Sequence, residues 1–182
     1  MPSHGRRVEK YLLIGALGIA TVGAVQDIRG GRIPNWLTYG GLLVALAVRT
    51  FVSGWPGLKI GFIGMLAGGG IFYLLFLLGG MGGGDVKLMA AVGAWAGTAQ
   101  TAGVLIAAAI AGGFLAVGYM VFYRQVHRTL LNTVELVQHH LTFGFQPHPE
   151  LNIREPGSMR VPYGLAIAMG TLYCLGRAFS WR

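Results

Sequence analysis

The chain has 182 residues, of which 54% are hydrophobic and 11% are charged, and its formal net charge is +8. Soluble domains carry about 25% charged residues, so this composition excludes an ordinary soluble domain and indicates a membrane protein. In such proteins an excess of Lys and Arg sets topology or binds lipid headgroups, and no nucleic-acid motif accompanies it, so we expect membrane lipid and no nucleic acid as a partner. The single cysteine, Cys174, excludes an internal disulfide and a cysteine zinc site.

Apolar segments close to transmembrane length recur along the whole chain. We expect six, at residues 11–25, 36–52, 58–78, 86–97, 101–123 and 161–179. Backbone polar groups in lipid must be satisfied within a segment, and a helix needs about 20 residues to cross a membrane. The pattern predicts an all-α, polytopic helical bundle with about six transmembrane helices, forming one membrane-embedded domain over residues 1–182. The fourth segment is short for a full crossing and is expected to begin below the lipid boundary or to lie where the bilayer is thinned.

The longest polar stretch, residues 124–160, interrupts this pattern. Its apolar residues recur every three or four positions and face a basic, polar side: Val126, Leu130, Val134, Val137 and Leu141. Such a stripe predicts an amphipathic helix that lies on the membrane surface. The stretch also holds several histidines, but adjacent His139 and His140 would point to different faces of that helix, so we expect no metal site.

Asp27 and Asp85 are the only aspartates in the chain, and each lies where an apolar run meets a polar loop. One predicted span precedes Asp27 and two more separate it from Asp85, so both should face the same side of the membrane. A pair of carboxyl groups can hydrolyse a peptide bond, because one activates water while the other protonates the amide. We therefore predict Asp27 and Asp85 as a catalytic pair.

Three glycines, Gly82, Gly83 and Gly84, immediately precede Asp85. Glycine readily adopts positive φ and lets a backbone approach closely, so an extended peptide could pair with this loop through main-chain hydrogen bonds. We take the three glycines as candidate substrate-binding residues, together with Lys87, whose more common role would be setting topology or binding lipid phosphate. Alternatively, the glycines only end one helix and Asp85 caps the next.

The motifs together resemble those of a known family. Gly82-Gly83-Gly84-Asp85 is a Gly-x-Gly-Asp motif, and Val86-Lys87-Leu88 continues it as in the type IV prepilin and preflagellin peptidases. The stretch from Asp27-Ile28-Arg29 to Ile33-Pro34-Asn35 resembles the first-aspartate motif of that family, and Val161-Pro162-Tyr163-Gly164 is similar to its late Pro-Tyr-Gly segment. The resemblance spans roughly residues 23–168.

This resemblance implies a multi-pass aspartic endopeptidase of the bacterial cytoplasmic (inner) membrane. It would cut the short basic leader from a prepilin or pseudopilin substrate at the cytoplasmic face, with Asp27 and Asp85 as the catalytic residues. The chain has no paired-cysteine domain between its first two spans, so it resembles the short form found in Flp/Tad pilus systems. We accordingly expect no S-adenosylmethionine and no other cofactor. Glycine-rich spans also permit a homo-oligomer.

A second interpretation comes from a different functional class. The chain would be a non-catalytic membrane scaffold or a small ion-coupled transporter, with the two aspartates acting as helix caps or as an ion relay. Asparagine at either position distinguishes the two interpretations, because it keeps a capping side chain but cannot transfer the proton.

Overall fold

The computed structural model describes residues 2–78, 80–122, 135, 142 and 162–180. Its helices are α1 (Pro2–Gly30), α2 (Asn35–Leu77), α3 (Gly83–Phe122) and α5 (Tyr163–Ser180), and no strand occurs within these described ranges. The predicted all-α class is therefore confirmed for this part of the chain. The predicted amphipathic helix of residues 124–160 lies outside the described residues, apart from two isolated positions.

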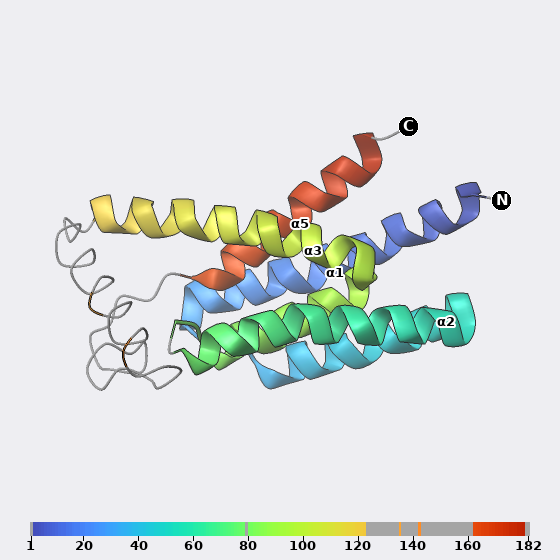
Figure 1. Cartoon of the computed structure of the whole chain (residues 1–182), viewed down its shortest axis with the longest axis horizontal. Coiled ribbons are helices and arrows are strands. Elements are labelled where there is room, and N and C mark those ends of the chain that lie inside the picture. Colours follow the sequence, from blue (N-terminus) through green and yellow to red (C-terminus); the bar gives the residue numbers. More distant parts are fainter. Residues whose placement is uncertain (1, 79, 123–134, 136–141, 143–161, 181–182) are drawn as a thin grey trace.

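Helices α2 and α3 each break once and double back (Figure 1). Gly54 in α2 has φ 62° and ψ −150°, and Gly97 in α3 has φ 72° and ψ 174°. Residues other than glycine avoid these conformations, and Pro56 adds a second helix breaker just beyond Gly54. Both breaks fall at the boundaries between predicted apolar segments. The apolar pattern thus located the places where the chain reverses.

Among the residues that the structure describes, three helices are long and apolar enough to cross a membrane, at Arg7–Gly30, Asn35–Leu77 and Gly83–Phe122, while α5 is not among them. Large apolar side chains point outward along these helices, including Phe51 at 93%, Phe114 at 76% and Phe122 at 81% exposure. In water such a surface would be unfavourable, whereas in lipid it is the ordinary outer face of a helical bundle. The prediction of a helical membrane protein is supported in this general form.

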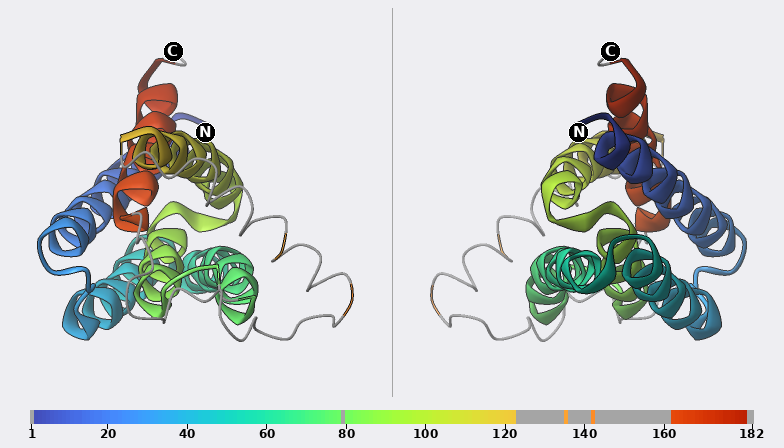
Figure 2. Two further views of the ribbon diagram at one scale, coloured as in Figure 1. Left: turned by 90° about the vertical axis from the view of Figure 1, so that its left-hand side faces the viewer. Right: turned by 90° about the vertical axis from the view of Figure 1, so that its right-hand side faces the viewer.

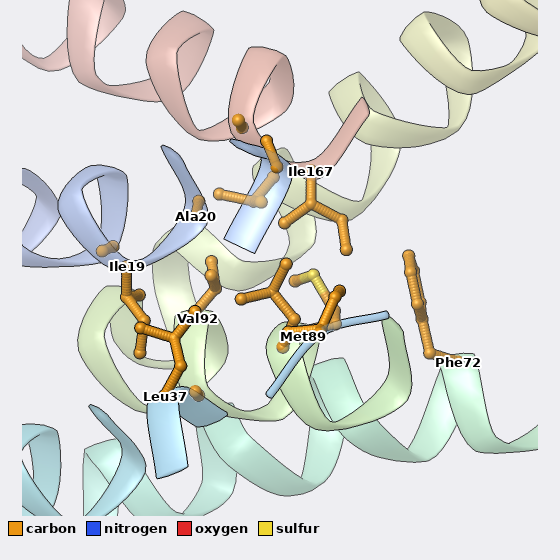
Figure 3. Packing of buried hydrophobic residues seen from close by; sticks show 14 of the residues in the cluster. Ile19, Ala20, Leu37, Phe72, Met89, Val92 and Ile167 are labelled. Atoms are coloured by element: carbon orange, nitrogen blue, oxygen red, sulfur yellow. The ribbon is translucent and has the colours of Figure 1, made fainter. Parts of the chain in front are cut away.

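The first half of α3, which carries Asp85, is the centre of the bundle. Figure 2 shows α2 on one side and α5 on the other, with α1 and α3 between them. Met89 and Val92 of α3 are fully buried, and Figure 3 shows them among side chains from α1, α2 and α5 such as Ala20, Phe72 and Ile167. Asp85 is therefore carried on a helix whose position is fixed from several directions.

Close backbone contact joins this half of α3 to α2. A side chain on Gly64 would overlap the carbonyl oxygen of Gly93, and a side chain on Gly93 would overlap the carbonyl oxygen of Gly64. Small residues are favoured at helix contacts in membranes because they allow the backbones to approach.

Arg49 holds the other end of the same half-helix. Its side chain is only 4% exposed, with Nε donating to the carbonyl of Ala94 at 2.7 Å and Nη2 donating to that of Trp95 at 2.8 Å. Helix α3 breaks at Gly97, so these carbonyls lie near a helix end, where cations and donors are favourable.

Candidate active site

Asp27 lies in the last turn of α1, as predicted from its position at the end of the first apolar run. Gly31, with φ 59°, follows the helix and donates its N–H to the Asp27 carbonyl oxygen at 2.8 Å. A glycine in the left-handed conformation commonly ends a helix in this way. Helix α2 then starts at Asn35, where the Leu37 N–H donates to the Pro34 carbonyl at 3.2 Å. Pro34 is thus the cap residue of α2, which begins one residue before the predicted apolar segment 36–52.

Asp85 lies in the first turn of α3, and both its backbone N–H and its carboxylate bind Gly82 of the preceding loop. The Asp85 N–H donates to the Gly82 carbonyl at 3.2 Å, while the Gly82 backbone in turn hydrogen-bonds the Asp85 carboxylate. This reciprocal arrangement resembles a capping box, in which the third helical residue binds back to the cap. The capping alternative is confirmed only in part. Asp85 does bind back to Gly82, but α2 ends at Leu77, before the three glycines, and Asp85 is the third residue of α3 rather than its cap. This local role does not exclude chemistry, because Asp85 also lines a cavity.

The glycine loop differs from the prediction in its backbone conformation. Among the described glycines, positive φ occurs at Gly31, Gly54 and Gly97, and not at Gly82, Gly83 or Gly84. The missing side chains instead permit close packing. A Cβ atom on Gly84 would lie 3.3 Å from Ile33 Cβ, and one on Gly82 would lie 3.0 Å from Asp85 Oδ2. Gly84 therefore lets the loop between α1 and α2 pack against the start of α3, while Gly82 leaves room for the Asp85 carboxylate.

Both aspartates line one cavity of about 710 Å³. The two carboxyl groups are close enough for the charge of Asp27 to act on Asp85. The prediction that the aspartates face the same side is thereby confirmed. The walls combine polar and basic side chains with apolar ones, and include Arg32, Lys87, Tyr119, Ile33, Phe76 and Met81. Two carboxyl groups in a partly apolar recess are one arrangement that can carry out general acid–base chemistry on a peptide bond.

Lys87 also lines the cavity, but its ammonium group has protein partners. Nζ donates to Asn35 Oδ1 at 2.9 Å and lies 5.2 Å from the centre of the Tyr39 ring. These contacts join the start of α3 to the start of α2, and a cation above an aromatic ring is itself favourable. Lys87 thus links the two predicted motifs, a role that its sequence position did not indicate. Substrate binding by Lys87 and by the three glycines stays a prediction.

The start of α5 forms another wall of the site. Pro162 and Tyr163 line the cavity, and the Gly164 N–H donates to Asp27 Oδ2 at 3.0 Å. The sequence contained this segment only as part of a resemblance and gave it no role. The signal that could have found it is a Pro-Tyr-Gly motif at the start of an apolar segment whose predicted N-terminal end faces the same side as both aspartates.

These features describe a helical membrane protein with a paired-carboxyl cavity at one end of the bundle, suited to hydrolysis. Residues 13–117 match the model of the type IV leader peptidase family. The match covers more than half of the chain and includes both aspartates, so the chain belongs to this family and is a peptidase of the leader-peptidase kind. The comparisons with curated proteins and with solved structures gave no match. The resemblance noted from the motifs is confirmed at family level.

Proposed function

We propose that the chain is an aspartic endopeptidase that removes the basic leader from prepilin-like proteins at the cytoplasmic face of the bacterial inner membrane. One observation carries this proposal. The only two aspartates of the chain come from separate motifs, 58 positions apart, and line a single cavity. Neither helix capping nor packing requires the two to meet.

The chemistry follows from two carboxyl groups that share one proton. The carboxylate takes a proton from water as the water oxygen bonds to the scissile carbonyl carbon. The carboxylic acid gives its proton to the amide nitrogen as the carbon–nitrogen bond breaks, which leaves a new carboxyl terminus and a new amino terminus. Because the groups interact, their protonation belongs to the pair rather than to either residue.

The substrate class rests on the family and on the form of the site. Gly82, Gly83 and Gly84 have no side chains, so the main chain of an extended peptide could lie close to them across the cavity. Helix α1 ends at Gly30 and α2 begins at Asn35, so only a short loop separates them. That short connection supports the short, Flp/Tad-like form, with no methyl-donor cofactor. Membrane lipid and a further copy of the chain remain proposed partners.

The doubled-back course of α2 and α3 supports six membrane crossings. Each of these helices would cross twice and α1 would cross once. The sixth crossing would be α5, which is less apolar than the other three helices but packs along α1 and α3. At a rise of about 1.5 Å per residue, the half of α3 from residue 83 to 97 is about 21 Å long, against a hydrocarbon core of about 30 Å. This half would therefore begin below the lipid boundary, which gives Asp85 access to water.

The test is cleavage of a co-expressed Flp-type prepilin by the wild type, Asp27→Asn and Asp85→Asn at matched membrane levels. Asparagine keeps an oxygen that accepts the Gly164 or Gly82 backbone N–H, so the fold should survive. We expect leader removal by the wild type and none by either variant. Full processing by either variant would remove that aspartate from the chemistry and favour the scaffold or transporter interpretation.

A further inference from the structure

The first turn of α5 lies outside the region that the family model matches, yet it reaches the proposed catalytic pair. The match ends at residue 117, whereas α5 runs from Tyr163 to Ser180. The Gly164 N–H nevertheless donates to Asp27 Oδ2 at 3.0 Å, across 137 positions of sequence. A contact of this length in sequence depends on the whole bundle and not on the local helix.

Helix α5 lacks an ordinary N-terminal cap, and Asp27 takes its place. The first N–H groups of a helix have no partner within it, and a Ser, Thr, Asp or Asn side chain at the cap usually accepts one of them. The residue before α5 is Pro162, whose side chain has no acceptor, although its carbonyl accepts the Leu165 N–H at 3.1 Å. A carboxylate from α1 is the acceptor instead. The partial positive charge of the helix start favours a negative group there.

Glycine at 164 permits this close approach between α5 and α1. A Cβ atom on Gly164 would lie 3.1 Å from Asp27 Oδ2, and 3.2 Å from both Asp27 Cβ and Ala24 Cα. Two of these three atoms belong to the side chain of Asp27 itself. A side chain at this position would therefore shift either α5 or the Asp27 side chain by a few tenths of an ångström.

Glycines of α3 and α5 set the position of α5 on the second half of α3. A Cβ atom on Gly112 would lie 2.9 Å from Tyr163 Cε1, so the tyrosine ring lies directly on the α3 backbone. Further along α5, a Cβ atom on Gly170 would lie 2.6 Å from the backbone nitrogen of Ala108 in α3. These two contacts fix α5 along its axis, and therefore fix where the Gly164 N–H points.

From these contacts we infer that the first turn of α5 positions the catalytic carboxyl group. The Gly164 N–H holds Asp27 toward Asp85, and the seating of Tyr163 on Gly112 holds the N–H in place. Gly164 is a positioning residue, since it acts through Asp27. This inference rests on the proposed peptidase function and adds to it a structural element outside the two aspartate motifs.

The test uses two glycine variants, each with a control on the same helix. Gly164→Ala is compared with Gly176→Ala in α5, and Gly112→Ala with Gly113→Ala in α3, because a Cβ atom on Gly176 or Gly113 meets nothing within 4 Å. The full-length protein in detergent cleaves a synthetic prepilin leader peptide, and kcat and KM are measured separately. A displacement of about 1 Å in a catalytic group can cost about 100-fold in rate. We expect kcat to fall at least about tenfold in Gly164→Ala and Gly112→Ala, with KM and both controls unchanged.

Two results would overturn the inference. One is a kcat in both test variants equal to that of their controls; the other is a raised KM with unchanged kcat, which would make this turn a substrate-binding element. Gly112→Ala leaves residue 164 intact, so it decides the question if Gly164→Ala does not fold. An inactive wild type would instead refute the proposed function. In that case thermal unfolding still tests the contact between Gly164 and Asp27. The contact predicts a lower Tm for Gly164→Ala than for Gly176→Ala, and equal Tm values would refute the contact.

Discussion

Arg49 does not line the cavity, and replacing it by methionine should lower the stability of the bundle. The guanidinium is 4% exposed and donates to the carbonyls of Ala94 and Trp95 at 2.7 and 2.8 Å. A hydrogen bond from a charged donor contributes about 1.5 kcal/mol at the low end, so losing two costs about 3 kcal/mol. Methionine keeps much of the apolar volume of the side chain, and it leaves both carbonyls without this donor. For a chain of this size the loss corresponds to a Tm lower by about 6–12 °C.

The assay is thermal unfolding of the purified protein in detergent, with Thr50→Ala as the control. Thr50 is the next residue, and its hydroxyl makes only a local, exposed bond to the Leu46 carbonyl. That variant should remain within about 0.5 kcal/mol of the wild type. Arg49→Lys, with a single donor group, should be intermediate. An Arg49→Met Tm equal to that of Thr50→Ala would refute the view that Arg49 secures the end of the half-helix that carries Asp85.

Further predictions concern the contacts around the same half-helix. Gly64→Ala should lower the Tm, because its new methyl group would overlap the Gly93 carbonyl and overpacking costs about 1–3 kcal/mol, whereas Gly70→Ala, with open space around it, should leave the Tm unchanged or raise it. Equal Tm values for the two would contradict the close packing of α2 on α3. Lys87→Met should reduce leader cleavage about tenfold, and Asn35→Ala should do the same, since each breaks the same bond between α3 and α2. The double variant should lose no more than either single one, and multiplying losses would show that Lys87 and Asn35 act separately.

The parts of the site that were predicted from the sequence depend on local signals for helix ends and on the number of apolar segments. Helix α1 ends beside Asp27 because Gly31 follows it, and α3 begins beside Asp85 because of its capping loop. The apolar pattern located the reversals at Gly54 and Gly97. Once the segments were known, their number placed both aspartates on one side. These inferences need only nearest neighbours and the alternation of apolar and polar stretches.

The parts that the sequence did not predict depend on contacts between distant segments. Nothing local to Arg49 shows that its charge is buried against α3, and nothing local to Gly164 shows that its N–H meets Asp27. The expected positive φ at the glycines before Asp85 was wrong for a related reason. Glycine serves either unusual backbone conformation or close approach, and only the position of Ile33 shows that close approach applies at Gly84.

The most direct test of the central claim is a kinetic cycle on the two aspartates. kcat/KM for leader-peptide cleavage is measured for the wild type, Asp27→Asn, Asp85→Asn and the double variant, all at the same folded concentration. Groups that act as one catalytic unit are strongly non-additive. The account predicts a loss of at least about 1,000-fold in each single variant and no further loss in the double variant. A single variant within about tenfold of the wild type, or losses that multiply, would contradict a shared two-aspartate mechanism.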